Sequence, residues 1–166
     1  ADGFKISTPR AAVKRTFDLL ASISLLLVAW PVMLLAALCI KLESGFSVAA
    51  VFRQVRVGLD GTTFSLLKFR SMHTSDPDDS AMWTRTNDKR VTRVGSFIRK
   101  TRIDELPQLF NVIRGDMSFV GPRPERPTFV DEFNESIPFY RERHRVKPGI
   151  TGWAQLCYPY GDSMED

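Results

Sequence analysis

Two adjacent carboxylates, Asp104 and Glu105, are the strongest candidates for chemistry in this sequence, and they lie just before Pro107 in the stretch RIDELPQL. Proline is tolerated in an α-helix only in the first turn, where its missing N–H has no intrahelical partner. Pro107 therefore predicts a helix that starts, or kinks sharply, near Asp104. An acid at that point can cap free N–H groups, and the helix dipole favours its ionised form. Since the same N–H groups attract phosphate, the pair is either an ordinary first turn or a nucleophile whose neighbour holds a cation.

A basic run precedes this pair. Between Arg85 and Arg102, seven Lys and Arg residues face one acid, Asp88. The run is either the solvated face of a helix or a surface that collects anions. Phe97 and Ile98 among these charges fit a helix that lies on a layer of lipid head groups.

A proline-rich stretch follows the acidic pair. Three prolines in six residues, Pro122, Pro124 and Pro127, impose an extended and stiff backbone. Such stiffness suits a linker, a peptide ligand or a rigid clamp. As a clamp, the stretch would present Arg123, whose planar guanidinium matches a phosphate or the edge of a base.

The longest apolar segment runs from Leu19 to Ile40 and contains 22 residues without a charge. As a helix it would be about 33 Å long, enough to cross a bilayer core of about 30 Å. The segment is too long for the core of a signal peptide. A buried helix of a soluble protein would also be expected to carry a charged face over this length.

Two features of this segment argue against a simple span. Pro31 lies near its middle and predicts a kink or break, whose freed backbone groups Ser22 or Ser24 could satisfy. Both flanks are basic, whereas a spanning helix usually concentrates basic residues on the cytoplasmic side. A span and a re-entrant hairpin therefore both stay open. The basic flanking residues are Lys5, Arg10, Lys14 and Arg15 before the segment and Lys41, Arg53 and Arg56 after it.

The chain after Lys41 has the pattern of a small, mainly helical α+β domain. β-Branched and aromatic residues in Val48–Val57 and Thr63–Phe69 predict two strands. The Asp60-Gly61 turn between them predicts a β-hairpin, and a polar loop is expected over Thr74–Ser80.

Two helices are expected beyond the hairpin. Apolar residues at amphipathic spacing predict the first, and Gly115 would end it. A short second helix is expected from Thr128 to Glu135. The chain thus divides into an N-terminal membrane segment, residues 1–42, and a second domain, residues 43–166. The spaced apolar residues of the first helix are Leu106, Leu109, Phe110 and Ile113.

The composition favours an anionic partner. The 166 residues include 23 Lys and Arg against 19 Asp and Glu, a net charge of +4. Nucleic acid, phospholipid head groups and phosphorylated metabolites all satisfy that charge. The two cysteines, Cys39 and Cys157, are too few for a disulfide framework and indicate a reducing compartment. No Cys and His spacing typical of a metal site is present.

Several motifs occur in a fixed order along the chain. In that order and spacing they resemble the monotopic phosphoglycosyl transferases, bacterial sugar transferases that are also described as polyprenyl-phosphate hexose-1-phosphate transferases. The resemblance extends from about Val13 to Tyr160, and the combination is specific although each motif alone is weak. The motifs are Lys14-Arg15, Lys68-Phe69-Arg70-Ser71-Met72, Asp104-Glu105-Leu106-Pro107-Gln108, residues 115–124 (GDMSFVGPRP) and residues 147–152 (KPGITG).

The resemblance implies a reaction and a set of site residues. Members of the family transfer a sugar-1-phosphate from a UDP-sugar to a polyprenyl phosphate such as undecaprenyl phosphate and release UMP. They thereby start a lipid-linked glycan of the exopolysaccharide, capsule or O-antigen type. By this likeness Asp104 is the nucleophile that forms a phosphosugar–enzyme intermediate, and Glu105 is the ligand of a required Mg²⁺. The substrate-binding positions that the likeness implies are Lys68, Arg70, Arg99, Pro122, Arg123 and Pro124.

The resemblance also implies a location. Family members lie on the cytoplasmic face of the bacterial inner membrane, anchored by a re-entrant helix-break-helix hairpin and contacting phospholipids through amphipathic interfacial helices. This chain has Trp30 where many relatives have Ser before the hairpin proline. Larger members suggest a homodimer and extend beyond the point that corresponds to Asp166, so the chain is expected to be a catalytic fragment or to lack further residues. The donor sugar stays open, with a neutral hexose favoured.

Two other functions stay open as alternatives. A membrane-anchored basic module that binds anionic lipid or nucleic acid would explain the charge and the apolar segment, but not the acidic pair beside a Pro-Arg-Pro stretch. No nucleic-acid-binding motif is recognised, so no nucleic acid partner is expected. The second alternative is a transferase that uses a nucleoside diphosphate donor without a covalent step.

Overall fold

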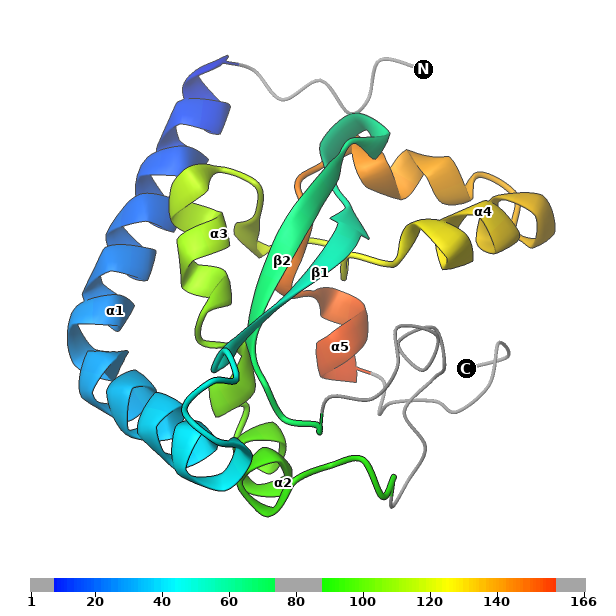
Figure 1. The fold of residues 1–166 in the computed structure, drawn as a ribbon. Helices are drawn as coiled ribbons and strands as arrows, with labels where there is room; N and C mark the ends of the chain where they lie inside the picture. The colour runs from blue at the N-terminus through cyan, green and yellow to red at the C-terminus, as the bar shows by residue number, and fades with distance from the viewer. Residues whose placement is uncertain (1–7, 74–87, 158–166) are drawn as a thin grey trace. The chain divides into compact units, whose positions relative to one another are not determined.

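The computed structural model describes residues 8–73 and 88–157, and helices predominate in this part of the chain (Figure 1). The mainly helical α+β class is thereby confirmed. The elements are α1 (Thr8–Ser44), β1 (Val51–Val57), β2 (Thr63–Phe69), α2 (Arg93–Lys100), α3 (Gln108–Arg114), β3 (Ser118–Val120), α4 (Pro127–Ser136), β4 (Gly149–Thr151) and α5 (Trp153–Cys157). Short 3₁₀ turns cover η1 (Leu59–Gly61), η3 (Ile103–Glu105) and η4 (Tyr140–Arg145). The polar loop expected over Thr74–Ser80 lies outside the described residues.

The helix α1 is continuous over 37 residues and includes Pro31. Of the kink or break predicted at Pro31, a break is therefore not observed. One missing hydrogen bond does not end a helix whose neighbouring residues, mostly Leu, Ala and Met, favour helix strongly. Ser22 does not supply the compensation that was expected of it. Its side chain is fully buried, and its Oγ has no hydrogen-bond partner among the described residues.

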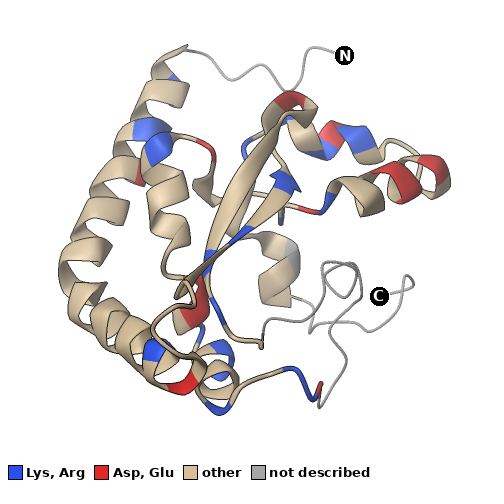
Figure 2. Cartoon of the chain, viewed as in Figure 1, with Lys and Arg blue, Asp and Glu red and all other residues tan. Residues whose placement is uncertain are grey.

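Most of α1 presents apolar side chains to its surroundings. Figure 2 shows that its charged residues lie toward its two ends, with an uncharged middle. Leu27 and Val28 are 71% and 76% exposed, and only 17% of the most apolar 18-residue stretch is buried. By length and composition α1 is the one described helix that could cross a membrane. These properties indicate membrane association.

The strands β1 and β2 form the predicted hairpin. The Gly58 N–H donates to the Thr62 carbonyl at 2.7 Å, and the Arg70 N–H donates to the Ala50 carbonyl at 2.8 Å. These two bonds lie at opposite ends of the same antiparallel ladder. The short connection through η1 leaves no room for a parallel crossover.

Contacts group the chain into two compact units that both include parts of α1 and of the hairpin. The first unit comprises the described residues of Ala1–Leu26, Gln54–Leu66 and Gln108–Asp166; the second comprises those of Leu27–Arg53 and Leu67–Pro107. The core of the first unit contains Leu66, Val112 and Met117 with Phe64, Phe119 and Ile150 around them. The core of the second contains Ala36, Ile40, Ala50, Phe69 and Ile98.

In the first unit, the start of α1 is fixed to the edge of the small parallel sheet. Lys14 Nζ donates to Ser118 Oγ, and Asp18 Oδ1 accepts hydrogen bonds from Ser118 Oγ at 3.0 Å and from the Phe119 N–H at 3.1 Å. Asp18 is almost fully buried, so these bonds offset the cost of removing its carboxylate from water. Arg15 donates to the carbonyls of Val112 and Ile113 at 2.6 Å each and so closes the end of α3.

The parallel strands β3 and β4 bring two sequence motifs together in this unit. Ser118 pairs with Gly149, and Val120 pairs with Thr151. A Cβ atom at Gly121 would collide with the carbonyl oxygen of Lys147, so the close approach of the two motifs requires glycine there. The expected helices are both present: α4 covers Pro127–Ser136, and α3 ends directly before Gly115.

In the second unit, the end of α1 holds the start of α2. Glu43 Oε1 accepts from the Arg93 N–H at 2.8 Å, and Oε2 accepts from the Val94 N–H at 3.1 Å. These are N–H groups that a helix leaves unpaired at its first turn. A Cβ atom at Gly95 would collide with the carbonyl of Ser71, so glycine allows α2 to reach the chain that follows β2. The face of α2 that carries Ile98 is buried, and Phe97 is 62% exposed.

Candidate active site

The acidic pair lies on the η3 turn, which follows α2 in the second unit. Arg102 begins this turn in the left-handed region, at φ 60° and ψ 14°. The helix predicted to start near Asp104 begins at Gln108 instead, directly after Pro107. Asp104 is therefore not the cap of that helix, and its Oδ1 has no hydrogen-bond partner among the described residues. The capping prediction was wrong because Pro107 lies directly before α3, whereas Asp104 belongs to the separate η3 turn.

Asp104 is buried, with 8% of its surface exposed. Burial raises the pKa of its carboxyl, the nearby Lys68 ammonium lowers it, and the Glu105 charge raises it further. Arg99 and Arg102 act in the same direction as Lys68. The carboxylate is thus poorly solvated and surrounded by cations, rather than held ionised by a helix end as predicted. An anion in this state is a stronger nucleophile than one in water.

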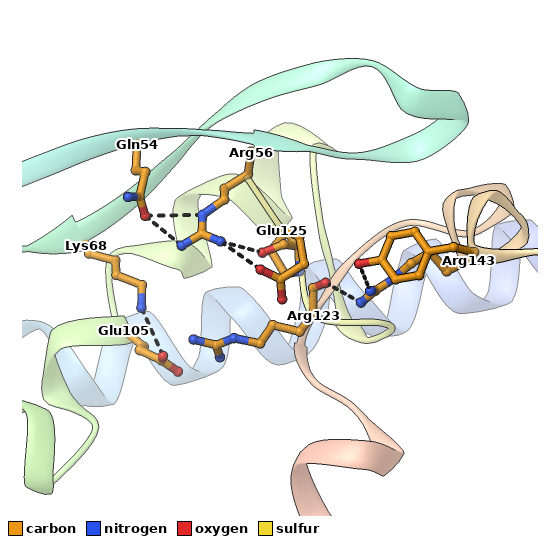
Figure 3. Close-up of polar contacts among 9 residues, drawn as sticks. Gln54, Arg56, Lys68, Glu105, Arg123, Glu125 and Arg143 are labelled. Carbon is orange, nitrogen blue, oxygen red and sulfur yellow. Dashed lines mark hydrogen bonds and ion pairs between the residues drawn. The ribbon is translucent and has the colours of Figure 1, made fainter. Parts of the chain in front are cut away.

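Glu105 is held by two cations. Lys68 Nζ lies 3.2 Å from Glu105 Oε1 and donates a hydrogen bond to it (Figure 3), and Arg102 Nη1 lies 3.4 Å from the same oxygen. Both contacts use Oε1 of the carboxylate. This arrangement fixes the orientation of Glu105 and balances its charge.

The other two basic residues predicted for the site differ in their surroundings. Arg70 Nε donates to the Ala49 carbonyl at 2.9 Å, and its guanidinium lies 5.9 Å from the centre of the Phe52 ring. Arg99 lies in the last turn of α2 and acts on Asp104 through its charge. The second unit thus brings together Lys68, Arg99, Asp104 and Glu105, whereas Arg70 is fixed to the chain before β1.

The Pro122-Arg123-Pro124 stretch belongs to the first unit and is held through its main chain. The carbonyl of Pro122 accepts from the Gly149 N–H at 3.0 Å, and the carbonyl of Arg123 accepts from Arg143 Nη2 at 2.8 Å. Arg56 Nη1 donates to the Pro124 carbonyl at 3.0 Å (Figure 3). The stretch is therefore a rigid loop, as its prolines predicted.

Arg56 and Arg143 were not recognised as site residues from the sequence. Arg56 had been counted only among the basic residues that flank the apolar segment, but it is buried and paired with Glu125 at 3.3 Å. Arg143 lies in the run YRERHR, where nothing distinguishes it from Arg141 or Arg145. Both bind carbonyl groups of a distant segment, and a main-chain acceptor leaves no signal in the sequence.

Comparison with known proteins identifies the family. The sequence pattern of the bacterial sugar transferases matches residues 9–166. The chain belongs to this family. It is 50% identical, over 94% of its length, to a UDP-N-acetylgalactosamine-undecaprenyl-phosphate N-acetylgalactosaminephosphotransferase of Aeromonas hydrophila. It is also similar to an undecaprenyl-phosphate glucose phosphotransferase of Komagataeibacter xylinus (52% identical over 86% of the chain) and to a UDP-glucose:undecaprenyl-phosphate glucose-1-phosphate transferase of Escherichia coli (45% over 87%).

The chain spans about a third of the length of these relatives: 36%, 27% and 31% of the three proteins, respectively. The match therefore concerns a shared region. The motifs described above, including the acidic pair and the Pro-Arg-Pro loop, all lie within the part of this chain that matches the family pattern.

The acidic pair fits the Mg²⁺ expected for this family. No group of three or more His, Cys, Asp and Glu that could hold a metal occurs in residues 8–73 and 88–157. Magnesium does not require such a cage, because it usually retains several waters and binds one or two carboxylates together with substrate phosphates. Glu105, which lies beside the unpartnered Asp104 Oδ1, is a carboxylate of that kind and is the residue to which the family resemblance assigns Mg²⁺.

Proposed function

We propose that this chain transfers a sugar-1-phosphate from a UDP-sugar to undecaprenyl or a related polyprenyl phosphate, with Asp104 as a covalent nucleophile. The product would be a polyprenyl diphosphate-linked sugar, the first intermediate of a lipid-linked glycan. The family relatives support the general reaction, since their names specify undecaprenyl-phosphate sugar phosphotransferases.

One observation carries the proposal of covalent catalysis: a buried carboxylate oxygen of Asp104 lacks a hydrogen-bond partner within the described chain. A buried unpaired carboxylate oxygen is costly for stability. Buried carboxylates without a partner are frequently functional residues. An oxygen without a hydrogen-bond partner in the protein is also available to attack a substrate. Its surroundings of Lys68, Arg99 and Arg102 are those expected where a phosphate must approach an anion.

In the first step, an Asp104 carboxylate oxygen attacks the β-phosphorus of the UDP-sugar. The bond between that phosphorus and the bridging oxygen breaks, and UMP leaves with the bridging oxygen and its electron pair. The enzyme is left with an acyl phosphate that carries the sugar. No proton needs to be removed from the nucleophile, provided that Asp104 is ionised.

Charge neutralisation is the main task of the surrounding residues in this step. The diphosphate and the nucleophile are both anionic, so they repel each other unless cations lie between them. Lys68 and Arg99 are placed to reduce this repulsion near Asp104. Glu105 would hold Mg²⁺, which would supply Lewis-acid stabilisation of the phosphate oxygens. Arg123 would hold the nucleotide or its phosphates through its planar guanidinium.

In the second step, a phosphate oxygen of the polyprenyl phosphate attacks the phosphorus of the acyl phosphate. The bond to Asp104 breaks, and the carboxylate is regenerated with its electron pair. Because the transfer is divided in this way, the nucleotide and the lipid do not need to occupy the site at the same time. This division suits one substrate that comes from the cytosol and another whose head group lies at the membrane.

The anchoring of α1 supports a monotopic arrangement on the cytoplasmic face. Near its start Asp18 accepts hydrogen bonds from Ser118 and Phe119, and near its end Glu43 accepts them from α2. The described residues after α1 include no second helix long and apolar enough to cross a bilayer. Each end of α1 is thus hydrogen-bonded to residues of its own unit, and we propose that the helix enters the membrane without crossing it.

A direct assay tests the proposed reaction. The chain in detergent or nanodiscs is incubated with Mg²⁺, undecaprenyl phosphate and a panel of UDP-sugars, and released UMP and the lipid product are quantified. We expect turnover with at least one glucose, galactose or N-acetylated amino sugar donor. Folded protein that yields no lipid product from any donor would contradict the proposal.

A further inference from the structure

We propose that Arg143 and Arg56 are positioning residues that fix the main chain of the loop Pro122–Glu125 and thereby orient Arg123 toward the nucleotide. The inference rests on the proposed function in one respect only, namely that Arg123 binds the donor nucleotide. All of the contacts that carry it lie within the first unit.

Four successive carbonyl groups of this loop accept hydrogen bonds from four different residues. The carbonyls of Pro122 and Glu125 accept from the N–H groups of Gly149 and Val57 at 3.0 and 2.9 Å. The two carbonyls between them accept from side chains, those of Arg143 and Arg56. Proline has no N–H, so a loop with prolines on both sides of Arg123 can be held by its main chain mainly through its acceptors.

Arg143 binds the carbonyl of Arg123, the residue proposed to hold the nucleotide. Its Nη2 donates to the Arg123 carbonyl at 2.8 Å, while its Nη1 donates to the hydroxyl of Tyr140. The guanidinium also lies 4.7 Å from the centre of the Tyr140 ring, within the range of a cation–π contact. Tyr140 is fixed in turn against Phe133, with ring centres 5.2 Å apart. Arginine is suited to this role because its planar group donates in two set directions at once.

Arg56, which lies in β1, binds the next carbonyl of the loop. Its Nη1 donates to the Pro124 carbonyl at 3.0 Å and to Glu125 Oε2 at 3.3 Å. Gln54 Oε1 accepts from Arg56 Nη2 at 2.7 Å and from Nε at 3.2 Å, which fixes the plane of the guanidinium. The buried Arg56 thus binds both Gln54 and the Pro124–Glu125 segment.

These contacts have a consequence for substrate binding. The direction of the Arg123 side chain follows from the orientation of its own peptide planes, and those planes are set by the carbonyl bonds on either side. Displacement of a substrate-binding group by about 1 Å can reduce catalysis by about a hundredfold. Loss of either positioning arginine would therefore act through Arg123.

A double-mutant cycle separates this role from a purely structural one. UDP binding to the chain in detergent is measured for Arg123→Ala, Arg143→Ala and the combined variant. Arg141→Ala removes an exposed arginine from the same turn and is the matched control. Arg143→Lys keeps the charge with a single donor group, and Arg56→Lys does the same opposite Glu125. Thermal unfolding of each variant reports stability independently.

We expect Arg143→Ala to weaken UDP binding about tenfold and to raise KM for the UDP-sugar with a smaller change in kcat. In the Arg123→Ala background the same substitution should change UDP binding less than about twofold. Arg143→Lys should recover part of the loss, Arg56→Lys should raise KM, and Arg141→Ala should behave as wild type.

Other outcomes would overturn the inference. Additive losses in the double variant would show that Arg143 does not act through Arg123, and unchanged UDP binding in Arg143→Ala would show that it does not position the loop. A wild-type chain that binds UDP but transfers no sugar phosphate would contradict the proposed function alone, while the binding cycle would still decide the role of Arg143. A wild-type chain that does not bind UDP would contradict both.

Discussion

The surroundings of Asp104 act on its carboxylate in two opposite directions. Burial and an unpaired oxygen make its carboxylate costly, and Lys68 recovers part of that cost through its charge. An ordinary surface acid would be hydrated and unreactive. The same environment that destabilises the fold is the one that a phosphorus-directed nucleophile requires.

The pH dependence of transfer should reflect the raised pKa of Asp104. The nucleophile must be ionised, so kcat/KM should fall on the acid side at a pH above that expected for a solvated aspartate, whose pKa is 3.8. Lys68 lowers this pKa, and therefore Lys68→Met should move the acid limb to higher pH. The exposed Lys89 provides the matched control, Lys89→Met. An acid limb that is the same in both variants would contradict the assignment.

Asp104→Asn should abolish transfer and raise the thermal stability at pH 7. A carboxyl whose pKa is raised by folding favours the fold when it is protonated, and that contribution is lost as the pH rises through the folded pKa. Removing the charge should therefore stabilise the chain at neutral pH, and the difference from wild type should disappear below about pH 4. Thermal unfolding over a pH series measures this. Asp131→Asn, at an exposed acid on α4, should show no such gain; a destabilised Asp104→Asn would refute the argument.

At the scale of elements, the site depends on how α2 is held at both ends. Its first N–H groups are capped by Glu43 of α1, and its last turn leads through Arg102 into the η3 turn that carries the acidic pair. Because α2 has only eight residues, a displacement of its first turn would also displace the acidic pair that follows it. The end of α1 and the proposed nucleophile Asp104 are therefore linked within the second unit.

Glu43→Gln should weaken this link. The substitution leaves one acceptor oxygen for two N–H groups, and loss of a helix cap costs about 1 kcal/mol. We expect a lower melting temperature in detergent and a reduced kcat, with a smaller change in KM. Glu132→Gln on the exposed side of α4 is the control. Equal melting temperatures and rates for the two variants would show that Glu43 does not support α2.

Local patterns predicted the elements better than they predicted the contacts between them. The hairpin and α4 followed from β-branched runs, turn residues and prolines, which act within a few residues. Of the kink or break predicted at Pro31, the break does not occur, because the helix on both sides tolerates one missing hydrogen bond. Asp104 and Glu105 were found from their types and their order, whereas Arg56 and Arg143 bind main-chain carbonyls that any residue could provide.

At the scale of the whole molecule, each end of the long apolar helix α1 is hydrogen-bonded to residues that follow it in the chain. Lys14, Arg15 and Asp18 fix the start of α1 within the first unit, and Glu43 fixes its end within the second. The proposed acceptor, a polyprenyl phosphate, carries an anionic head group at the membrane surface. A net charge of +4 suits that surface.

Cysteine accessibility tests this topology. In a variant without Cys39 and Cys157, single cysteines at Arg10 and at Ser44 are labelled with a membrane-impermeant reagent in oriented vesicles. Both should react from the same, cytoplasmic side, as the proposed monotopic arrangement requires. A cysteine at Trp153, which is 79% exposed, reports the side of that region. Labelling of the two helix ends from opposite sides would mean that α1 spans the bilayer.

The most direct test of the central claim is the mass of the protein after incubation with UDP-sugar and Mg²⁺ in the absence of polyprenyl phosphate. The account predicts release of one UMP per enzyme and an adduct of one sugar phosphate on the peptide that contains Asp104, which disappears when the lipid phosphate is added. The Asp104→Asn variant should show neither. Efficient lipid transfer by wild-type protein without any adduct or UMP burst, or transfer retained by Asp104→Asn, would contradict the covalent role of Asp104.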